Sequence, residues 1–227
     1  MSQLALPLRL ADHAVFDTFI AAGNEPLVDY LRSLTNAGPG QGAWIWGAPA
    51  TGKSHLLQAT CERFGDRAAY VPLESLAAAG PGLLEGLESR QLVCLDDLDS
   101  VAGDDAWERG LFILCNEVGE AGHHLVVSAA HAPRESGIVL ADLRSRLQRL
   151  ANFHVRELDD AARMAALQLR ARHRGLELPN DTASYLMSRS RRDMRSLYEL
   201  LDKLDLEALR AQRRLTIPFV KGVLHSG

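Results

Sequence analysis

Two glycines, a lysine and a serine stand at fixed offsets in the segment GAPATGKS, which spans residues 47–54. Gly47 and Gly52 allow the backbone to curl so that successive N–H groups face a single anion. Lys53 adds a positive charge that can reach the outer phosphates of a nucleotide, and Ser54 offers a hydroxyl to Mg²⁺. The pattern therefore predicts a loop that binds nucleotide phosphates together with Mg²⁺.

The flanking residues have the character that such a loop needs. Residues 43–46 (AWIW) form a short apolar run that predicts a buried strand, and residues 55–62 predict a helix. A loop between a strand and a helix brings the positive dipole end of the helix to the anion. This context favours a phosphate loop over a chance match to the pattern.

Two adjacent carboxylates form the second chemical signal. Asp96 and Asp97 follow the apolar run Leu92–Leu95, which is typical of a buried strand in a parallel sheet. Sheets of this kind bind ligands at the carboxyl ends of their strands. One carboxylate there can hold the water shell of Mg²⁺ while its neighbour orients or deprotonates an attacking water. Two acids after a strand also occur in simple turns, but the phosphate loop upstream favours the catalytic interpretation.

A polar side chain also closes the apolar strand predicted at 124–128. The hydroxyl of Ser128 can touch a γ-phosphate or an attacking water there, or take part in an ordinary turn. His123 and His124 lie at the start of this run. Adjacent histidines suggest a metal site, but no third ligand has a suitable spacing, so we interpret them as loop residues.

Length and composition are those of a globular protein. The 227 residues suffice for one α/β domain and a small second one. Hydrophobic residues make up 47% and charged residues 24%, and the net charge of -4 offers no bulk attraction to nucleic acid. The cysteines are expected to be buried free thiols in a reducing cytosol: Cys61, Cys94 and Cys115. Neither a secretory leader nor a membrane span is predicted, so a cytoplasmic protein is expected.

Alternating strand and helix patterns up to Leu158 predict an α/β fold, with helices on both faces of a parallel sheet. The predicted strands are residues 43–46, 68–73, 92–95, 124–128 and 153–156. Asn24 is expected to cap a helix that runs to about Leu34, and residues 107–121 predict another.

After Leu158 the strand patterns stop, and only helices are predicted. Asp159 is expected to cap the first of them, and Gly175 lies just past its end. The predicted helices are residues 159–173, 181–190 and 193–213. The chain thus divides into a tail at 1–14, an α/β core at 15–158 and a helical domain at 159–227.

Two groups of arginines invite a functional interpretation. Arg144 and Arg146 either form solvated pairs at a helix end or reach the nucleotide of a neighbouring subunit, as an arginine finger does. The second cluster consists of Arg189, Arg191, Arg192 and Arg195. It is either a solvated helix junction or the source of a lid contact to the nucleotide. A nucleic-acid patch is disfavoured because no aromatic residue is interleaved and the net charge is negative.

The first residues contain an apolar peptide, Gln3–Leu8 (QLALPL), whose proline prevents a continuous helix. Such a peptide is either a tail, disordered or folded back on its own domain, or a linear motif that docks into the pocket of a partner. The spacing does not choose between these interpretations.

The chain resembles the AAA+ ATPases. It contains, in the same order, a phosphate loop, a strand that ends in two aspartates, a strand that ends in a polar residue, arginines at the edge of the core and a helical appendage. The chain is similar in particular to the DnaA branch and, within it, to the Hda family of DnaA-homologous regulators. The resemblance covers nearly the whole chain and is carried by FDTF from Phe16, GKSHLLQA from Gly52, LDDL from Leu95, SRL from Ser145, RDMR from Arg192 and LTIPFVK from Leu215. It implies an AAA+ P-loop core with a five-stranded parallel sheet and a small C-terminal helical lid domain.

The resemblance also assigns roles to residues. It implies nucleotide contacts for Phe16, Gly47, Pro49, Thr51, Gly52, Lys53, Ser54, His55 and Arg195. Ser54 and Asp96 would bind the metal, and Asp97, Ser128 and Arg146 would act in catalysis, with Arg146 favoured over Arg144 as the finger. The loop departs from a more usual family form because Ala50 and Thr51 stand where a glycine is often found.

The resemblance further implies a function in the control of replication. A protein of the Hda family carries ADP or ATP with Mg²⁺, docks on the DNA polymerase III sliding clamp and stimulates hydrolysis of the ATP held by DnaA, which prevents re-initiation. The peptide at the start looks like the clamp-binding motif, with contacts at Gln3, Leu4, Leu6, Pro7 and Leu8 and a variable position at Ala5. DnaA and the clamp are the expected partners. Self-association into a homodimer or higher oligomer is also considered, and neither sequence-specific DNA binding nor membrane binding is expected.

Hydrolysis of its own ATP is left open, because Asp97 is shorter than the Glu common in other AAA+ proteins. A helicase loader of the DnaC kind shares the core and finger, but we expect it to carry a sizeable helicase-binding domain where this sequence has a short tail. A metabolic P-loop kinase would need a substrate-binding insertion, for which the sequence has no candidate. The DNA-binding domain of DnaA itself would follow the lid, where this sequence ends.

Overall fold

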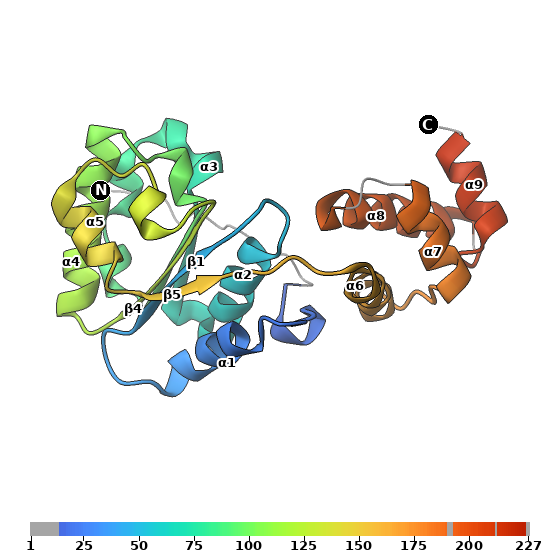
Figure 1. Cartoon of the computed structure of the whole chain (residues 1–227), viewed down its shortest axis with the longest axis horizontal. Coiled ribbons are helices and arrows are strands. Elements are labelled where there is room, and N and C mark those ends of the chain that lie inside the picture. The colour runs from blue at the N-terminus through green and yellow to red at the C-terminus, as the bar shows by residue number, and fades with distance from the viewer. Residues whose placement is uncertain (1–13, 190–192, 212, 226–227) are drawn as a thin grey trace. The chain divides into compact units, whose positions relative to one another are not determined.

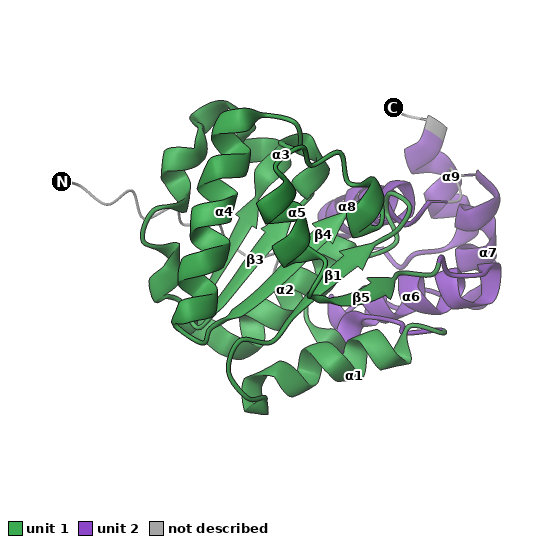
Figure 2. Ribbon diagram, turned by 60° about the vertical axis from the view of Figure 1, so that its left-hand side comes forward, with its two compact units in different colours: residues 1–16, 23–156 green, residues 17–22, 157–227 purple. Residues whose placement is uncertain are grey.

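The structure, a computed structural model, describes residues 14–189, 193–211 and 213–225. It forms two compact units (Figure 2). The first consists of Gly23–Arg156 and the segment that ends at Phe16, and the second of Asp17–Ala22 and the chain from Glu157 onward. A short segment within the residues expected to form the core, Asp17–Ala22, thus groups with the helical unit. Of the predicted tail, only Ala14 lies among the described residues.

A parallel sheet of five strands forms the centre of the first unit, as the sequence predicted (Figure 1). Its strands are β1 (Gly42–Trp46), β2 (Ala68–Pro72), β3 (Leu92–Asp96), β4 (His124–Ala129) and β5 (Ala151–His154). They lie in the order β2-β3-β4-β1-β5, so the strand before the phosphate loop pairs with β4 and β5. The two central neighbours, β3 and β4, are buried along their whole length, which explains their apolar runs.

Helices cover both faces of this sheet. The views in Figures 1 and 2 place α1 (Glu25–Ser33) and α2 (Lys53–Phe64) on one face and α4 (Asp105–Glu120) and α5 (Ala141–Leu147) on the other. The short helix α3 (Leu73–Leu76) follows β2, and the segment after it, whose structure the sequence left open, forms short 3-10 turns. The apolar face of α4 buries Leu111, Leu114 and Val118 against the sheet, as its spacing predicted.

The start of α1 corrects one expectation. Asn24 precedes α1, but its side chain makes no capping hydrogen bond. Its Nδ2 instead donates to the Arg156 carbonyl over 3.1 Å, and its Oδ1 accepts from the Arg156 N–H over 2.8 Å. A side-chain amide matches both backbone groups of an extended residue, so Asn24 ties the start of α1 to the end of the core instead of capping the helix.

The second unit contains α6 (Asp160–His173), α7 (Asn180–Arg189), α8 (Met194–Ala211) and α9 (Ile217–His225). The Asp159 carboxylate accepts from the Ala162 N–H over 2.7 Å, which confirms the predicted cap of α6. The predicted helices ended at residue 213, so α9, which has Pro218 as its second residue, was not predicted. Proline is tolerated in the first helical turn, where its missing N–H has no intrahelical partner in any case.

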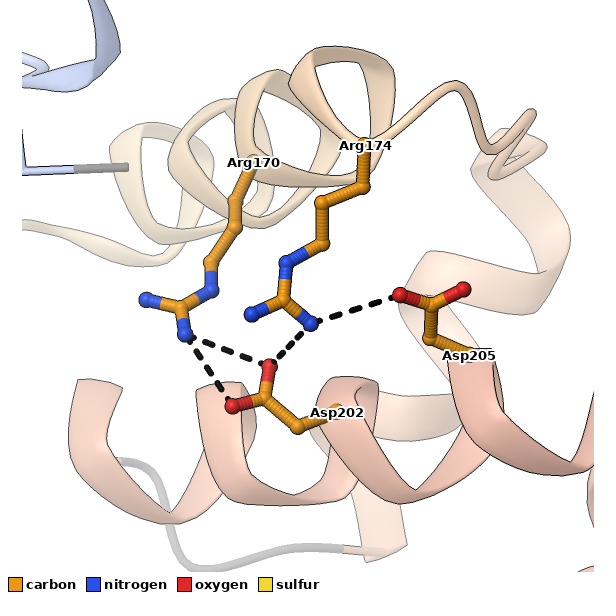
Figure 3. Close-up of polar contacts among 4 residues, drawn as sticks. All are labelled: Arg170, Arg174, Asp202 and Asp205. Carbon is orange, nitrogen blue, oxygen red and sulfur yellow. Dashed lines mark hydrogen bonds and ion pairs between the residues drawn. The ribbon is translucent and has the colours of Figure 1, made fainter. Parts of the chain in front are cut away.

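A set of ion pairs joins α6 to α8 (Figure 3). The Asp202 carboxylate accepts from Arg170 over 3.1 and 3.2 Å and from Arg174 over 2.7 Å. Arg174 also pairs with Asp205 over 3.5 Å. The Arg170 guanidinium lies 4.2 Å from the ring centroid of Tyr198 and is 7% exposed. Burial, opposed by Asp202, lowers the pKa of Arg170. The relative position of α6 and α8 thus depends on Asp202.

Other expectations concern cysteine and histidine. The three cysteines are free and buried, as predicted, and burial raises the pKa of Cys115 to about 12. His123 Nδ1 contacts the Glu88 carbonyl over 2.8 Å, and His124 Nδ1 contacts the Gln41 carbonyl over 3.2 Å, so both rings are engaged with backbone. Within the described ranges, no helix combines the length and apolarity needed to cross a membrane.

Candidate functional site

The phosphate loop lies between β1 and α2, where the sequence placed it. Gly47 has a φ of 155°, and a Cβ there would lie 2.8 Å from the Val155 carbonyl oxygen. Gly52, the residue before α2, has a φ of 98°, in the region that favours glycine. Ala50 also has a positive φ, 61°, at one of the two positions where a glycine was expected. Its left-handed backbone costs on the order of 1–2 kcal/mol relative to the ordinary helical region.

Lys53 is turned back into this loop. Its Nζ donates to the carbonyls of Gly47 over 2.8 Å and Ala48 over 3.0 Å, and the side chain is buried. Burial lowers the pKa of Lys53, while the negative charges of Asp97, Asp96 and Asp99 act in the opposite direction. Two of its three ammonium protons are used within the loop, and the loop carbonyls hold the charge beyond the carboxyl end of β1, where the acids at the end of β3 act on it.

The start of α2 supplies further donors. Gly52, the residue before this helix, has no side chain that could cap it, so the N–H groups of the first turn can serve an anion. Ser54 is the second residue of the helix, and Thr51 donates its hydroxyl to the Ala48 carbonyl over 2.9 Å. His55 Nε2 contacts the Val15 carbonyl over 2.8 Å and thereby holds the segment before the core against α2.

Phe16, which was expected at the nucleotide base, belongs to that segment. Its ring is 6% exposed, and the Arg32 guanidinium lies 5.3 Å from its centroid. Pro49 lies in the phosphate loop between β1 and α2. The structure thus brings the predicted loop residues, His55 and the Phe16 segment together around the start of α2.

Asp96, the last residue of β3, is 2% exposed and is held by two hydroxyl groups. Ser128 donates to its Oδ1, and Tyr70 donates to its Oδ2 over 2.6 Å. Gln58 of α2 in turn donates to the Tyr70 hydroxyl over 3.2 Å. Burial, followed by the charge of Asp96, raises the pKa of Tyr70, so the phenol keeps its proton for this bond. Asp96 is therefore fixed in one orientation by β2 and β4.

Asp97 has a different environment. It takes a left-handed backbone conformation, with a φ of 54°, and its N–H donates to the Ser128 hydroxyl oxygen over 2.9 Å. Burial, followed by the charge of Asp96, raises the pKa of Asp97 to about 6, although Lys53 acts to lower it. Such a value suits a group that exchanges a proton near neutral pH. Strained backbone of this kind is often found at functional sites.

Ser128 joins the two carboxylates. It is fully buried, and its single hydroxyl donates to Asp96 while it accepts from the N–H of Asp97. The sequence left open whether Ser128 touches a γ-phosphate or an attacking water, or takes part in an ordinary turn. In the structure its hydroxyl is engaged with both carboxylate residues, and it sets their relative position.

Sequence reasoning missed two residues of this site. Tyr70 was included only in a predicted strand, and its bond to Asp96 depends on the pairing of β2 with β3, in which Tyr70 lies opposite Cys94. Asp99 accepts from the Ala130 N–H over 2.5 Å and holds the loop after β3 against the end of β4. The sequence could have indicated Asp99 only through its position, two residues after the Asp-Asp pair.

The two candidate finger arginines differ in their surroundings. Arg144 donates from Nη1 to the Ile138 carbonyl over 3.2 Å and so turns back on its own segment. Arg146 is exposed, and its Cζ lies 5.5 Å from the ring centroid of Phe112 on α4. A guanidinium over an aromatic face is held in place while its N–H groups stay available.

The topology separates Arg146 from the phosphate loop of its own chain. α5 returns from the carboxyl end of β4 to the amino end of β5, and Arg146 lies in its last turn. The phosphate loop follows the carboxyl end of β1 instead, and α2 and α5 cover opposite faces of the sheet (Figure 2).

The remaining predicted residues belong to the second unit or lie outside the described residues. Arg195 is exposed in the first turn of α8, where Asp193 accepts from the Ser196 N–H over 2.8 Å. Arg189 lies over the Tyr185 ring, at 5.6 Å from its centroid. Arg191 and Arg192 lie outside the described residues, as do all five expected clamp contacts: Gln3, Leu4, Leu6, Pro7 and Leu8.

The residues present suit a magnesium nucleotide. The uncapped start of α2 and the Lys53 ammonium provide donors for phosphate, and oxygen ligands of the kind that Mg²⁺ prefers are supplied by Ser54 and the carboxylates after β3.

Comparison with known proteins agrees with this arrangement. Residues 160–224, most of the second unit, match the protein-family model described as "Hda, lid domain". The chain superposes on domain III of the replication initiation protein DnaA from Thermotoga maritima with a TM-score of 0.80 and 19% identity, covering 96% of this chain and 98% of that chain.

Two further solved structures share the fold. DnaA from Aquifex aeolicus, bound to AMPPCP, matches with a TM-score of 0.69 and 21% identity over 88% of this chain and 68% of that chain. The Holliday junction branch migration motor RuvB from Thermotoga maritima matches with a TM-score of 0.63 and 16% identity, over 94% of this chain and 72% of that chain. The five-stranded parallel core therefore has the AAA+ fold of these proteins, and the helical unit that follows it is similar to the Hda lid domain.

Proposed function

We propose that this protein regulates the initiation of bacterial chromosome replication by stimulating hydrolysis of the ATP held by DnaA. In this proposal it binds adenine nucleotide itself, docks on the sliding clamp through residues 3–8 and presents Arg146 to the nucleotide of DnaA. The match of the lid to the Hda lid family, on a core with the fold of DnaA domain III, is the observation that carries the proposal.

The position of Arg146 supports a role in trans. Its guanidinium is exposed, rests on Phe112 and lies in the last turn of α5, away from the loop that would hold its own nucleotide. A guanidinium that arrives from a second subunit neutralises the charge that develops on the transferring phosphoryl group. For known arginine fingers this effect is worth about 10³ to 10⁵ in rate.

The nucleotide site of this chain would serve mainly to set its own shape. The loop N–H groups and Lys53 would bind the phosphates, with Phe16 near the base and Arg195 as a lid contact. Mg²⁺ bound by Ser54 and, through water, by Asp96 would neutralise phosphate charge. Asp97, with its pKa raised to about 6, is the residue that would accept a proton from an attacking water.

The finger is tested by measuring ATP turnover by DnaA in the presence of DNA-loaded sliding clamp and this protein. Arg146→Ala should reduce the stimulated rate to that of DnaA alone. Arg149→Ala removes another exposed arginine, just after α5, and should leave the stimulation intact. If Arg146→Ala stimulates as well as the unchanged protein, the proposed role of Arg146 is wrong.

Clamp docking is tested separately by a pull-down with purified sliding clamp. Gln3→Ala and Leu6→Ala should lose the clamp, whereas Ala5→Ser, at the position that the family motif leaves variable, should retain it. Retention of clamp by the first two variants would contradict docking through this peptide. Binding to a replicative helicase in the same format, with no stimulation of DnaA, would instead support a helicase loader.

A further inference from the structure

One buried carboxylate lies away from the nucleotide site. Glu108, in the first turn of α4, is 2% exposed. Acidic side chains are seldom buried unless their oxygens accept hydrogen bonds, because an unpaired charge is costly to remove from water. In the part of the chain that the structure describes, the hydrogen bonds to the Glu108 carboxylate all come from backbone N–H groups.

These bonds hold the entrance to α5. Glu108 Oε2 accepts from the Leu140 N–H over 2.6 Å, and the two oxygens share the Val139 N–H over 2.9 and 3.1 Å. Leu140 immediately precedes α5, and its own side chain makes no capping hydrogen bond. The Glu108 carboxylate therefore fixes where the chain enters α5, and its negative charge lies beside the positive end of the helix dipole.

The same carboxylate holds a third group. Its Oε1 accepts from the Gly103 N–H over 2.7 Å. Gly103 lies between β3 and α4, downstream of Asp96 and Asp97, and has a positive φ of 86°. The segment that follows the catalytic strand end and the segment that begins α5 thus share a single anchor.

A second contact between α4 and α5 lies one helical turn further along α4. Phe112 is four residues after Glu108, on the same side of the helix, and the Arg146 guanidinium rests on its ring. One face of α4 therefore holds the start of α5 through Glu108 and supports the finger through Phe112.

We propose that Glu108 is a positioning residue for Arg146: its carboxylate sets the start of α5, so that the guanidinium is presented over Phe112 at a fixed place on the surface. This inference rests on the proposed function of Arg146. Glu108 itself is buried and would not contact the nucleotide of the partner. A misplacement of reacting groups by about 1 Å can cost about 100-fold in rate, so a weakened anchor should be visible in turnover.

The test uses Glu108→Gln in the full chain. The amide has nearly the same shape, but its NH₂ group would face a backbone N–H, so at least one of the three N–H groups loses its acceptor. Glu117→Gln, an exposed position on the same helix, is the matched control. Hydrogen exchange should become faster in Glu108→Gln at the Gly103 or the Leu140 amide, whichever faces the NH₂ group, and should remain unchanged in Glu117→Gln.

The functional readout is the turnover of ATP-bound DnaA with clamp and DNA. Glu108→Gln should lower the stimulated rate at saturating protein by about 10- to 100-fold, with the concentration for half-maximal stimulation little changed. The double variant Glu108→Gln/Arg146→Ala should be no slower than Arg146→Ala, because both changes act through one guanidinium. If Glu108→Gln does not fold, Glu108→Asp keeps the charge but is too short to reach all three N–H groups, and it is measured in the same way.

The outcomes separate the two proposals. If Arg146→Ala leaves stimulation intact, the proposed function fails and no finger remains for Glu108 to position. If Arg146→Ala abolishes stimulation but Glu108→Gln matches Glu117→Gln in turnover, only the positioning role is overturned. A rise in the half-maximal concentration without a fall in the saturated rate would also overturn it, since that would indicate weaker association instead of a misplaced finger.

Discussion

The hydroxyl of Ser128 on β4 donates a hydrogen bond to the carboxylate of Asp96 at the end of β3. Two side chains that are far apart in the sequence therefore hold each other at the point where the two central strands end. Because Ser128 also accepts from the N–H of Asp97, one buried oxygen arranges both the candidate metal ligand Asp96 and the candidate catalytic acid Asp97.

Ser128→Ala should destabilise the protein by about 1–3 kcal/mol, since Asp96 loses a donor and the Asp97 N–H loses its acceptor in a buried setting. Urea unfolding measures this change. Ser89→Ala removes a hydroxyl that donates to the Gly86 carbonyl at an exposed site and should change the stability by less than about 0.5 kcal/mol. Equal effects of the two substitutions would show that Ser128 does not hold the carboxylates.

Asp97→Asn should stabilise the protein free of nucleotide and Mg²⁺ near neutral pH. The folded state raises the pKa of Asp97 from 3.8 to about 6, mainly through burial, so the charged form is disfavoured in the fold. That cost is absent below the unfolded-state pKa, grows between 3.8 and about 6, and is complete above it. A shift of this size corresponds to about 3 kcal/mol for a fully buried group, but Asp97 is half-buried and screened by solvent, so about 1 kcal/mol is expected.

The measurement is chemical unfolding of both proteins in EDTA from about pH 4.5 to about pH 7.5. The stability advantage of Asp97→Asn should grow as the pH rises through this window. An advantage that is the same at every pH would reflect the left-handed backbone, which Asn tolerates well, and would contradict a raised pKa of Asp97.

Gly42→Ala should be among the most damaging small substitutions in the core. A Cβ at Gly42 would lie 2.1 Å from the Leu125 carbonyl oxygen, which belongs to the paired residue of β4, and 2.8 Å from Leu150 Cδ2. Backbone cannot move aside without separating β1 from β4, so a loss of about 3 kcal/mol is expected. Thermal unfolding checks this. Gly38→Ala, with open space around its Cβ, should be nearly neutral, and a comparable loss there would refute the steric explanation.

Asp202→Ala should destabilise the lid by about 1.5–3 kcal/mol, because Arg170 is buried and would lose the carboxylate that neutralises it. Glu207→Ala breaks a pair with the exposed Arg210 and should cost less than about 1 kcal/mol. Hydrogen exchange in α6 and α8 reports the stability of the lid directly. If protection there is the same in Asp202→Ala and the unchanged protein, the ion pairs do not join the two helices.

Much of this protein could be predicted from local patterns. The strands were predicted because buried parallel strands are continuous apolar runs, and β1 to β5 lie within two residues of their predicted ends. The phosphate loop was recognisable because glycine, lysine and serine at this fixed spacing bind a phosphate anion through residues that are neighbours in the sequence. The cap at Asp159 was predictable for the same reason, since a cap involves only neighbouring residues.

The sequence by itself therefore determined the order of the elements, the phosphate loop and the position of the two acids. Only the tertiary structure decided which side chains meet across elements. Tyr70 reaches Asp96 because β2 pairs with β3, Asn24 bonds Arg156 instead of capping α1, and Glu108 of α4 holds the start of α5. Such contacts depend on strand order and helix packing. These bring together residues that lie far apart in the sequence, at spacings that match no local pattern.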